Sequence, residues 1–272
     1  MIDPATVATR VERIGNATLY LADSRDVLPL LSRPDLILSD PPYGQQVTIN
    51  IRLRHQPEAG RYTTTGSRNV RRQQKQEYPA AMIGDDVDFD PSWLVEAAPK
   101  VLLWGAHRFY SRLPDHGRLL IWDKVPNGKE RTQGDGEAAW FSQPGPLRMF
   151  RHLWDGLSIA AGYETKVERR GAAAAARVHP TQKPVDLMLW CIDRCALPVG
   201  SMIYDPYMGG GSTGIAAAIA GMRFVGVEIE PVYFDAACRR IEHAQRHVDH
   251  AAAVTAGSIA QAAKSMQGAR HD

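Results

Sequence analysis

Apolar and polar positions alternate along the chain in a pattern that predicts strands and helices in turn. Residues 17–39 read as strand, helix and buried strand, because a β-rich run, an amphipathic run and an apolar run follow one another. The same alternation continues through 91–124 and returns over 185–248. It predicts an α/β fold with a doubly wound, mostly parallel sheet, whose functional residues gather at the carboxyl ends of the strands.

Three stretches break this pattern. Residues 45–76 are basic and lack periodicity, which is typical either of a solvated insertion or of a phosphate-binding arm that orders on nucleic acid. Residues 125–178 interleave basic and aromatic side chains, as in a nucleic-acid face or the core of a small subdomain. Residues 249–272 are Ala-rich and predict frayed helix or disorder. The basic residues of the first stretch are Arg52, Arg54, Arg61, Arg68, Arg71, Arg72 and Lys75, against one acid, Glu58.

Composition narrows the class of protein. The 272 residues fit one large or two modest domains, and a net charge of +2 identifies no partner. Three cysteines are too few for a disulfide framework, and the chain has neither an apolar leader nor an 18-residue apolar run. These features predict a cytoplasmic protein without a membrane segment. His243, His247 and His250 share helical spacing, but an exposed helix explains that spacing better than a metal site does, so we expect no metal.

A glycine-rich loop between a predicted strand and helix carries the first chemical signal. Gly209, Gly211 and Gly214 satisfy the pattern G-x-G-x-x-G, and Glu228 ends the next strand. Glycines let the backbone approach a ligand, and the acid suits two ribose hydroxyls. Asp205 just before the loop fits an ammonium group better than a pyrophosphate, because like charges repel. The loop therefore predicts S-adenosylmethionine, which has an amino group, a ribose and a sulfonium but no phosphate.

A second loop, Asp40-Pro41-Pro42-Tyr43, follows a predicted buried strand. The lone pair of an exocyclic base amine is delocalised, so the amine is a poor nucleophile. Asp40 and the Pro41 carbonyl are placed to accept its two N–H bonds and favour a reactive geometry, while Tyr43 offers a face for a flipped base. A strand-end turn with a capping Asp is the plainer interpretation.

A third motif, residues 179–184, precedes a predicted helix. Thr181 and Lys183 are placed to hold the carboxylate of a methionine moiety near the helix N-terminus. An ordinary N-cap region explains the same residues if the motif is taken alone.

Together the three motifs make the chain resemble the S-adenosylmethionine-dependent amino-methyltransferases of DNA. The catalytic loop precedes the cofactor loop, as in the circularly permuted group called the beta class, which implies a Rossmann-like methyltransferase fold with an inserted recognition region. The resemblance spans about 14–245. It departs from the usual motif at Tyr207, where Phe is common, and at Gly210, where Ser is common. It implies that Asp23 approaches the cofactor's adenine, that Glu228 holds the ribose, and that the methionine side is lined by Asp205, Pro206, Tyr207, Gly209, Gly211 and Thr213.

The resemblance also divides the chain. Residues 1–124 would form the catalytic half, 125–178 the target-recognition region, 179–248 the cofactor half and 249–272 a flexible tail. The predicted DNA contacts are Arg52, Arg54, Arg68, Arg71, Arg72, Lys129 and Arg131.

The sequence thus predicts methyl transfer to adenine N6 in duplex DNA by base flipping and in-line attack. Within the family that the chain resembles, Asp at the first position of the catalytic loop favours adenine, whereas cytosine-N4 enzymes more often have Ser there, and cytosine N4 is the alternative. A nicotinamide-dependent oxidoreductase and a non-catalytic DNA-binding relative remain as other classes. A homodimer and a cognate restriction endonuclease are left open.

Overall fold

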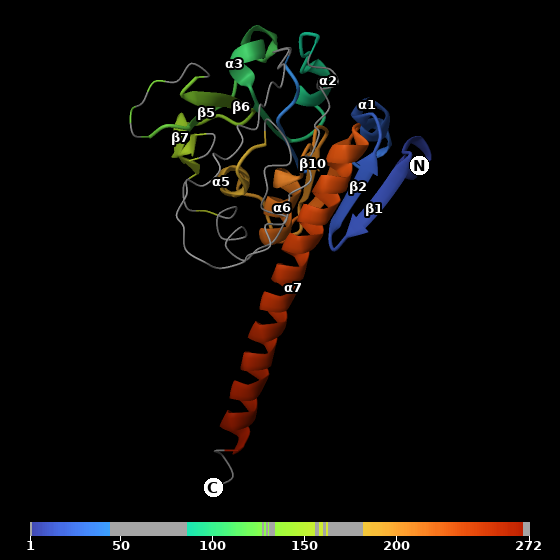
Figure 1. Ribbon diagram of the computed structural model, residues 1–272, viewed down its shortest axis with the longest axis vertical. Coiled ribbons are helices and arrows are strands. Elements are labelled where there is room, and N and C mark those ends of the chain that lie inside the picture. Colours follow the sequence, from blue (N-terminus) through green and yellow to red (C-terminus); the bar gives the residue numbers. More distant parts are fainter. Residues whose placement is uncertain are drawn as a thin grey trace, which may run out of the picture.

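The computed structural model describes residues 2–43, 86–126, 128, 130, 134–155, 158–159, 162 and 182–268 (Figure 1). The basic stretch at 45–76 lies outside the described residues, and so do Thr181, Lys129 and Arg131.

A nine-stranded sheet forms the body of the protein, in the order β1-β2-β11-β10-β3-β4-β6-β5-β7. The five central strands, from β2 to β4, pair in parallel, whereas β1 is antiparallel to β2 and β6 is antiparallel to both β4 and β5. The strands are β1 (Arg10–Ile14), β2 (Ala17–Leu21), β3 (Leu36–Ser39), β4 (Lys100–Trp104), β5 (Arg118–Asp123), β6 (Gly136–Phe141), β7 (Arg148–Arg151), β10 (Met202–Asp205) and β11 (Arg223–Glu228), with a separate small hairpin of β8 (Trp154–Asp155) and β9 (Ser158–Ile159).

Helices cover both faces of the sheet, which is why the central strands are apolar on both sides. Every residue of β3 is buried, and so is every residue of β10. Leu36 and Leu38 pack with α5 (Val185–Cys195) and α6 (Ser212–Ile219) on one face. Ile37 packs on the other face with residues of α1 (Ser24–Val27), α2 (Ser92–Val95) and α3 (Ala106–Phe109). Three short 3-10 turns, η1 (Pro4–Val7), η2 (Leu28–Leu30) and η3 (Tyr110–Arg112), complete the described elements. The predicted doubly wound α/β fold is confirmed.

Two strands inside the irregular stretch escape sequence analysis. Strand β6 inserts between β4 and β5, and β7 pairs with β5 at the edge of the same sheet. The predicted recognition region at 125–178 therefore overlaps the main sheet over these two strands. Neither strand shows a clear apolar period in the sequence, because β7 has only four residues, three of them exposed, and β6 begins with an exposed Gly136.

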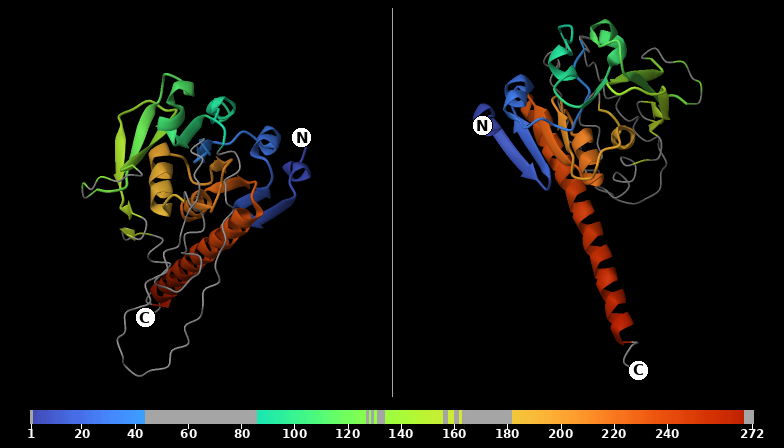
Figure 2. Two further views of the ribbon diagram at one scale, coloured as in Figure 1. Left: turned by 45° about the horizontal axis from the view of Figure 1, so that its top comes forward. Right: turned by 180° about the vertical axis from the view of Figure 1, so that it is seen from behind.

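The last helix, α7 (Pro231–Gly268), is a single helix of 38 residues. Its first half packs on α6 and on the β1–β2 edge, and its second half projects away from the body (Figures 1 and 2). The Ala-rich segment from 249, for which the sequence predicts frayed helix or disorder, is helical as far as Gly268. Ala has the highest helix propensity, which offsets the absence of a packing partner along residues 251–256, all of them exposed. None of the described helices is both long and apolar enough to cross a membrane.

Candidate active site

Acidic side chains stand at the carboxyl ends of four neighbouring parallel strands. Asp23 follows β2, Glu228 ends β11, Asp205 ends β10, and Asp40 follows β3. Because these strands are adjacent in the sheet, the four acids follow one another along a single edge. Strand spacing makes the edge about 14 Å long. The edge is therefore suited to an elongated ligand that presents several hydrogen-bond donors.

Ser39 joins the two predicted loops where β3 and β10 lie side by side. Its hydroxyl donates to Asp205 Oδ1 at 2.6 Å, although the two residues lie 166 positions apart in the chain. Ser39 directly precedes Asp40, so this buried contact holds the two loops side by side. Sequence analysis missed Ser39, whose only local signal is its place before the Asp-Pro-Pro-Tyr motif.

Asp205 is almost fully buried and accepts hydrogen bonds from several sides. Besides Ser39, the Tyr207 backbone N–H donates to Oδ1 at 3.1 Å, and the Thr213 side chain bonds the same carboxyl group. Burial raises the pKa of Asp205 to about 6, in spite of these hydrogen bonds. A cationic ligand group here would favour the ionised form and offset that cost.

Glu228 organises the backbone of the glycine loop. Its Oε2 accepts from Gly209 N at 2.8 Å, and its Oε1 accepts from Ile229 N at 3.0 Å and from Glu230 N at 2.9 Å. Burial raises the pKa of Glu228 to about 7, against the effect of those backbone donors. Oε1 already accepts two bonds, whereas Oε2 accepts one and keeps a second lone pair with which it can accept a ligand hydroxyl.

The three glycines of the G-x-G-x-x-G pattern serve different purposes. Gly209 and Gly211 have φ of +49° and +79°, a region that side chains disfavour. A Cβ on Gly214 would lie 2.5 Å from Ile241 Cδ1 and 2.8 Å from Phe224 Cε1. The first two glycines therefore allow the turn of the loop, and the third allows α6 to pack closely on α7 and β11.

Tyr207 extends the same edge toward α1 and α2. Its ring makes edge contacts with Phe89 and Trp93, with centroids at 5.9 Å and 6.3 Å. The side chains of Ser24 and Arg25 hydrogen-bond its hydroxyl, while burial raises its pKa to about 12. The hydroxyl that distinguishes Tyr207 from the usual Phe therefore has partners. Asp23 lies next to this group and caps α1, with Oδ1 accepting from Arg25 N at 2.9 Å.

The Asp-Pro-Pro-Tyr loop lies against β4 and α3. Gly105 has φ of +76°, and a Cβ at this position would lie 2.3 Å from Tyr43 Cε1, so the Tyr43 ring rests on the bare backbone. The His107 ring is 6.4 Å from the Tyr43 ring, and Arg108 Nε donates to His107 Nε2 at 3.2 Å. Burial is the largest cause of the lowered pKa of His107, and the neighbouring Arg108 adds to it.

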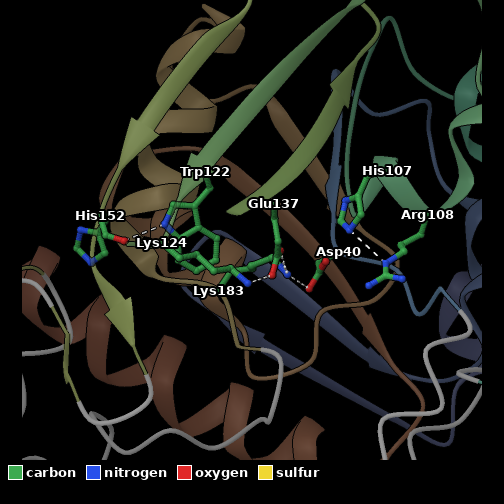
Figure 3. A network of polar contacts seen from close by, with 8 residues as sticks. All are labelled: Asp40, His107, Arg108, Trp122, Lys124, Glu137, His152 and Lys183. Carbon is green, nitrogen blue, oxygen red and sulfur yellow. Dashed lines mark hydrogen bonds and ion pairs between the residues drawn. The ribbon is translucent and has the colours of Figure 1, made fainter. Parts of the chain in front are cut away.

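Asp40 belongs to a buried chain of ion pairs, shown in Figure 3. Lys183 Nζ pairs with Asp40 Oδ2 and lies 3.0 Å from Glu137 Oε2, and Lys124 pairs with the second oxygen of Glu137. The Lys183 side chain is only 5% exposed. The other carboxylate oxygen, Asp40 Oδ1, is buried and has no hydrogen-bond partner among the residues that the structure describes. One acceptor at the β3 end of the edge therefore lacks a partner within the described part of the chain, which normally costs free energy unless a ligand or a water fills it.

Charge pairing determines the ionisation of this chain. Burial raises the pKa of Asp40, although Lys183 opposes the shift. Burial would also raise the pKa of Glu137, but Lys183 and Lys124 lower it to about 2. The pKa of Lys183, which burial alone would lower, is raised by Asp40 and Glu137. Two ammonium groups therefore balance two carboxylates.

Most predicted site residues described by the structure meet along this edge, in two groups. Asp23, Asp205, Glu228 and the glycine loop form one group. Asp40, Tyr43 and Lys183 form the other, so Lys183 contacts the catalytic loop and does not cap α5, whose N-cap is Pro184 without a side-chain hydrogen bond. Sequence analysis missed Glu137, Lys124, Gly105 and His107. Of these, only Lys124 has a local signal in the sequence, since it closes the strand-like run Ile-Trp-Asp-Lys at 121–124.

Two other kinds of candidate group outside this edge are metal ligands and cysteines. Within the described ranges, no three His, Cys, Asp or Glu side chains are grouped to hold a metal ion. Cys191 and Cys195 are free and buried, as expected of a reduced, packed pair.

Comparison with known proteins finds similarity to DNA methylases over part of the chain. A family model described as DNA methylase, of the type that joins N6 and N4 enzymes, matches residues 120–239. The matched segment contains Lys183, Asp205 and Glu228. It begins after Asp40, which it therefore does not include. Similar curated sequences include the type II methyltransferase M2.DpnII of Streptococcus pneumoniae, 41% identical over 64 residues, and YubD of Escherichia coli K12, named as a methylase, 36% identical over 77 residues. These matches cover 24% and 28% of this chain, and only 24% and 34% of those relatives.

Solved structures share the fold. The PvuII DNA methyltransferase, described as cytosine-N4-specific, aligns over 86% of this chain and 93% of its own, with a TM-score of 0.51 and 15% identity. A complex of M1.HpyAVI with S-adenosylmethionine aligns over 83% of this chain and 98% of its own, with a TM-score of 0.49 and 19% identity. The alignment with the PvuII enzyme shows that this chain shares its Rossmann-like α/β fold. The comparisons support the resemblance at the level of the N6 and N4 DNA methylases.

Proposed function

We propose that this protein is a DNA methyltransferase that uses S-adenosylmethionine to methylate the N6 amine of adenine in duplex DNA. The observation that carries this proposal is the placement of Asp40 beside Asp205, with Ser39 between them. An acceptor for a reacting amine and an acceptor for a cofactor ammonium then stand at adjacent strand ends.

The residues along the edge fit the cofactor in the order of its chemical groups. Asp23 would approach the adenine, Glu228 would accept from the ribose hydroxyls, and Asp205 would hold the ammonium of the methionine end. The raised pKa values of Asp205 and Glu228 support this assignment, because hydrogen-bond donors from a ligand would offset the cost of burying the two carboxylates. When bound, S-adenosylmethionine supplies a methyl group on a sulfonium, which is a good leaving group.

Asp40 is suited to hold a target amine. Its Oδ2 is occupied by Lys183, whereas its buried Oδ1 is free to accept an N–H bond. The Pro41 carbonyl would accept the second N–H, which favours a tetrahedral nitrogen. With S-adenosylmethionine bound, the nitrogen would form a bond to the methyl carbon as the carbon–sulfur bond breaks, S-adenosylhomocysteine would leave as a neutral thioether, and one N–H proton would pass to water. Orientation and charge placement would supply most of the rate.

Tyr43 provides a face for a base that has left the duplex. The ring is held from behind by Gly105 and flanked by His107. Aromatic stacking of this kind is typical of enzymes that flip bases. Cytosine N4 is the second candidate substrate, because the matching family joins both amines and both bases present the same kind of nucleophile.

The order of the loops supports membership of the permuted beta class. The strand carrying Asp40 precedes the strand carrying Asp205 in the chain, although the two strands are neighbours in the sheet. The region at 125–178 and the basic residues at 45–76 and at 129–131 would then serve DNA recognition. A homodimer and a partner endonuclease belong to the same proposal.

Methyl transfer from labelled S-adenosylmethionine to duplex DNA, followed by nucleoside mass spectrometry, tests the function. N6-methyldeoxyadenosine would support it, and N4-methyldeoxycytidine would keep the mechanism and change the base. Asp40→Ala should abolish transfer and preserve cofactor binding, with exposed Glu96→Gln as a matched control. Absence of any methylated nucleoside, with cofactor binding intact, would contradict the proposal and favour a silent DNA-binding relative. Binding of a nicotinamide cofactor in place of S-adenosylmethionine would favour an oxidoreductase.

A further inference from the structure

The ion-pair chain behind Asp40 reaches well beyond the residues that would touch a substrate. It runs from Asp40 through Lys183 to Glu137 and ends at Lys124, so charges alternate along it (Figure 3). Glu137 lies in β6 and Lys124 directly follows β5, and neither belongs to the two loops of the proposed site. Their side chains are 14% and 17% exposed. Charged groups removed this far from solvent are costly unless they are paired.

Both outer residues are held firmly by the sheet. Glu137 pairs in register with Trp122 across the antiparallel β5–β6 ladder. Lys124 donates its backbone N–H to Asp135 O at 2.9 Å, and its ammonium lies 4.9 Å from the centre of the Trp122 ring. Trp122 in turn donates to His152 O at 3.0 Å. The chain of charges is thus anchored to rigid elements, as expected where a side chain must be held in one orientation.

We infer that Glu137 and Lys124 are positioning residues that set the charge and orientation of Asp40 through Lys183. Glu137 Oε2 lies 3.0 Å from the same Lys183 ammonium that pairs with Asp40 Oδ2, and by fixing this ammonium it would keep Oδ2 occupied and leave Oδ1 to the substrate amine. Lys124 neutralises the second oxygen of Glu137 and keeps the chain balanced. This inference rests on the proposed function for the identity of the amine. The chain of contacts itself is independent of that function.

The two outer residues have opposite charges and should therefore shift the Asp40 titration in opposite directions. Glu137 raises the pKa of Asp40, whereas Lys124 lowers it. A role limited to packing would not produce shifts of opposite sign. The other groups facing Asp40 are unchanged by either substitution. They are Lys183, Asp205, the Tyr43 hydroxyl, and His107 and Arg108 of α3.

The test compares Glu137→Gln with Lys124→Met. In the ligand-free protein, the carboxyl titration of Asp40 is followed by 13C NMR, with Asp40→Asn used to assign the signal. We expect the midpoint to fall by about one pH unit in Glu137→Gln and to rise by about as much in Lys124→Met, as Coulomb interaction across a partly screened interior predicts. The single-turnover rate of methyl transfer should fall at acidic pH as Asp40 becomes protonated. The midpoint of this fall should move to lower pH in Glu137→Gln and to higher pH in Lys124→Met.

Controls separate this inference from the proposed function. Glu96→Gln removes an exposed carboxylate at the end of α2 and should leave the midpoint unchanged. Glu137→Asp keeps the charge and should restore the wild-type midpoint. Midpoints that stay fixed, or that move in the same direction in both variants, would overturn the inference even if the rates fall. If the wild type methylates no nucleoside, the proposed function fails, and the NMR midpoints still decide the role of the chain. If Glu137→Gln does not fold, Lys124→Met and Glu137→Asp carry the test.

Discussion

Asp205 is expected to reduce the stability of the ligand-free protein, and Asp205→Asn should reveal by how much. The carboxyl is buried, and its pKa of about 6 lies above the value of 3.8 for a free side chain. An acid whose pKa is higher in the folded state binds more protons when folded, so stability falls as the pH rises through the window from 3.8 to 6. Asn can still accept from Ser39 and from Tyr207 N, so the substitution removes the charge and keeps the main hydrogen bonds.

The magnitude follows from the two pKa values. At pH 8 the carboxylate is ionised in both states, and a difference of about two pKa units corresponds to roughly 3 kcal/mol of destabilisation. At pH 4.5 the folded state is still protonated, and the same relation gives about 1 kcal/mol. The gain in unfolding free energy from Asp205→Asn should therefore be larger at pH 8 than at pH 4.5 by about 2 kcal/mol.

Urea unfolding at the two pH values measures this difference directly. Other titrating groups affect both proteins alike, so they cancel when the variant is compared with the wild type, apart from the coupled Glu228 and Asp40. The same variant should bind S-adenosylmethionine at least tenfold more weakly, since the acceptor for its ammonium has lost its charge. A stability change that is equal at the two pH values would refute the reasoning, and undiminished cofactor affinity would refute the role of Asp205 in binding.

Three further substitutions test how the edge is built. Gly105→Ala should lower methyl transfer at least tenfold and leave the cofactor affinity measured by calorimetry unchanged. The new Cβ would displace the Tyr43 ring, and alanine disfavours the positive φ of this position. Activity equal to that of the wild type would show that the placement of Tyr43 does not depend on Gly105. Tyr207→Phe should cost about 1 kcal/mol in urea unfolding, through the lost hydrogen bonds to Ser24 and Arg25, while the ring keeps its contacts with Phe89 and Trp93. Gly214→Ala should cost roughly 1–3 kcal/mol by overpacking against Ile241 and Phe224. Adding Ile241→Val should recover part of that loss, and a double variant no more stable than Gly214→Ala would contradict the packing explanation.

The sequence predicted those elements whose pattern is local. The strands β3, β10 and β11 and the helices α5 and α6 each show an apolar run or face that needs no tertiary information. The loops that follow β3 and β10 were recognised because their prolines and glycines are local backbone signals. Strands β6 and β7 were missed because their sequences lack a strong alternation of apolar and polar residues. They form strands because they pair with β4 and β5 in the folded sheet.

The charges behind Asp40 could not be found in this way, because they are joined only by the folded sheet. Lys183 and Asp40 lie 143 positions apart, and Glu137 sits in a stretch that looks irregular when read alone. Taken locally, Lys183 is a residue before a helix, and an N-cap region is its simplest interpretation. Strand order changes that interpretation, because β6 inserts next to β4 and brings Glu137 close enough to hold the ammonium from behind.

The insertion of β6 has a further consequence for the chemistry of the site. A lone lysine against Asp40 would lower the pKa of that carboxyl strongly, and would also leave its ammonium free to move onto both oxygens. Glu137 competes for the same ammonium, so Asp40 keeps a weaker partner and one unsatisfied oxygen. A carboxylate of this kind is a better acceptor for a neutral amine than one saturated by a cation. The antiparallel strand that interrupts the otherwise parallel order would therefore supply part of what the proposed site needs to act on an amine.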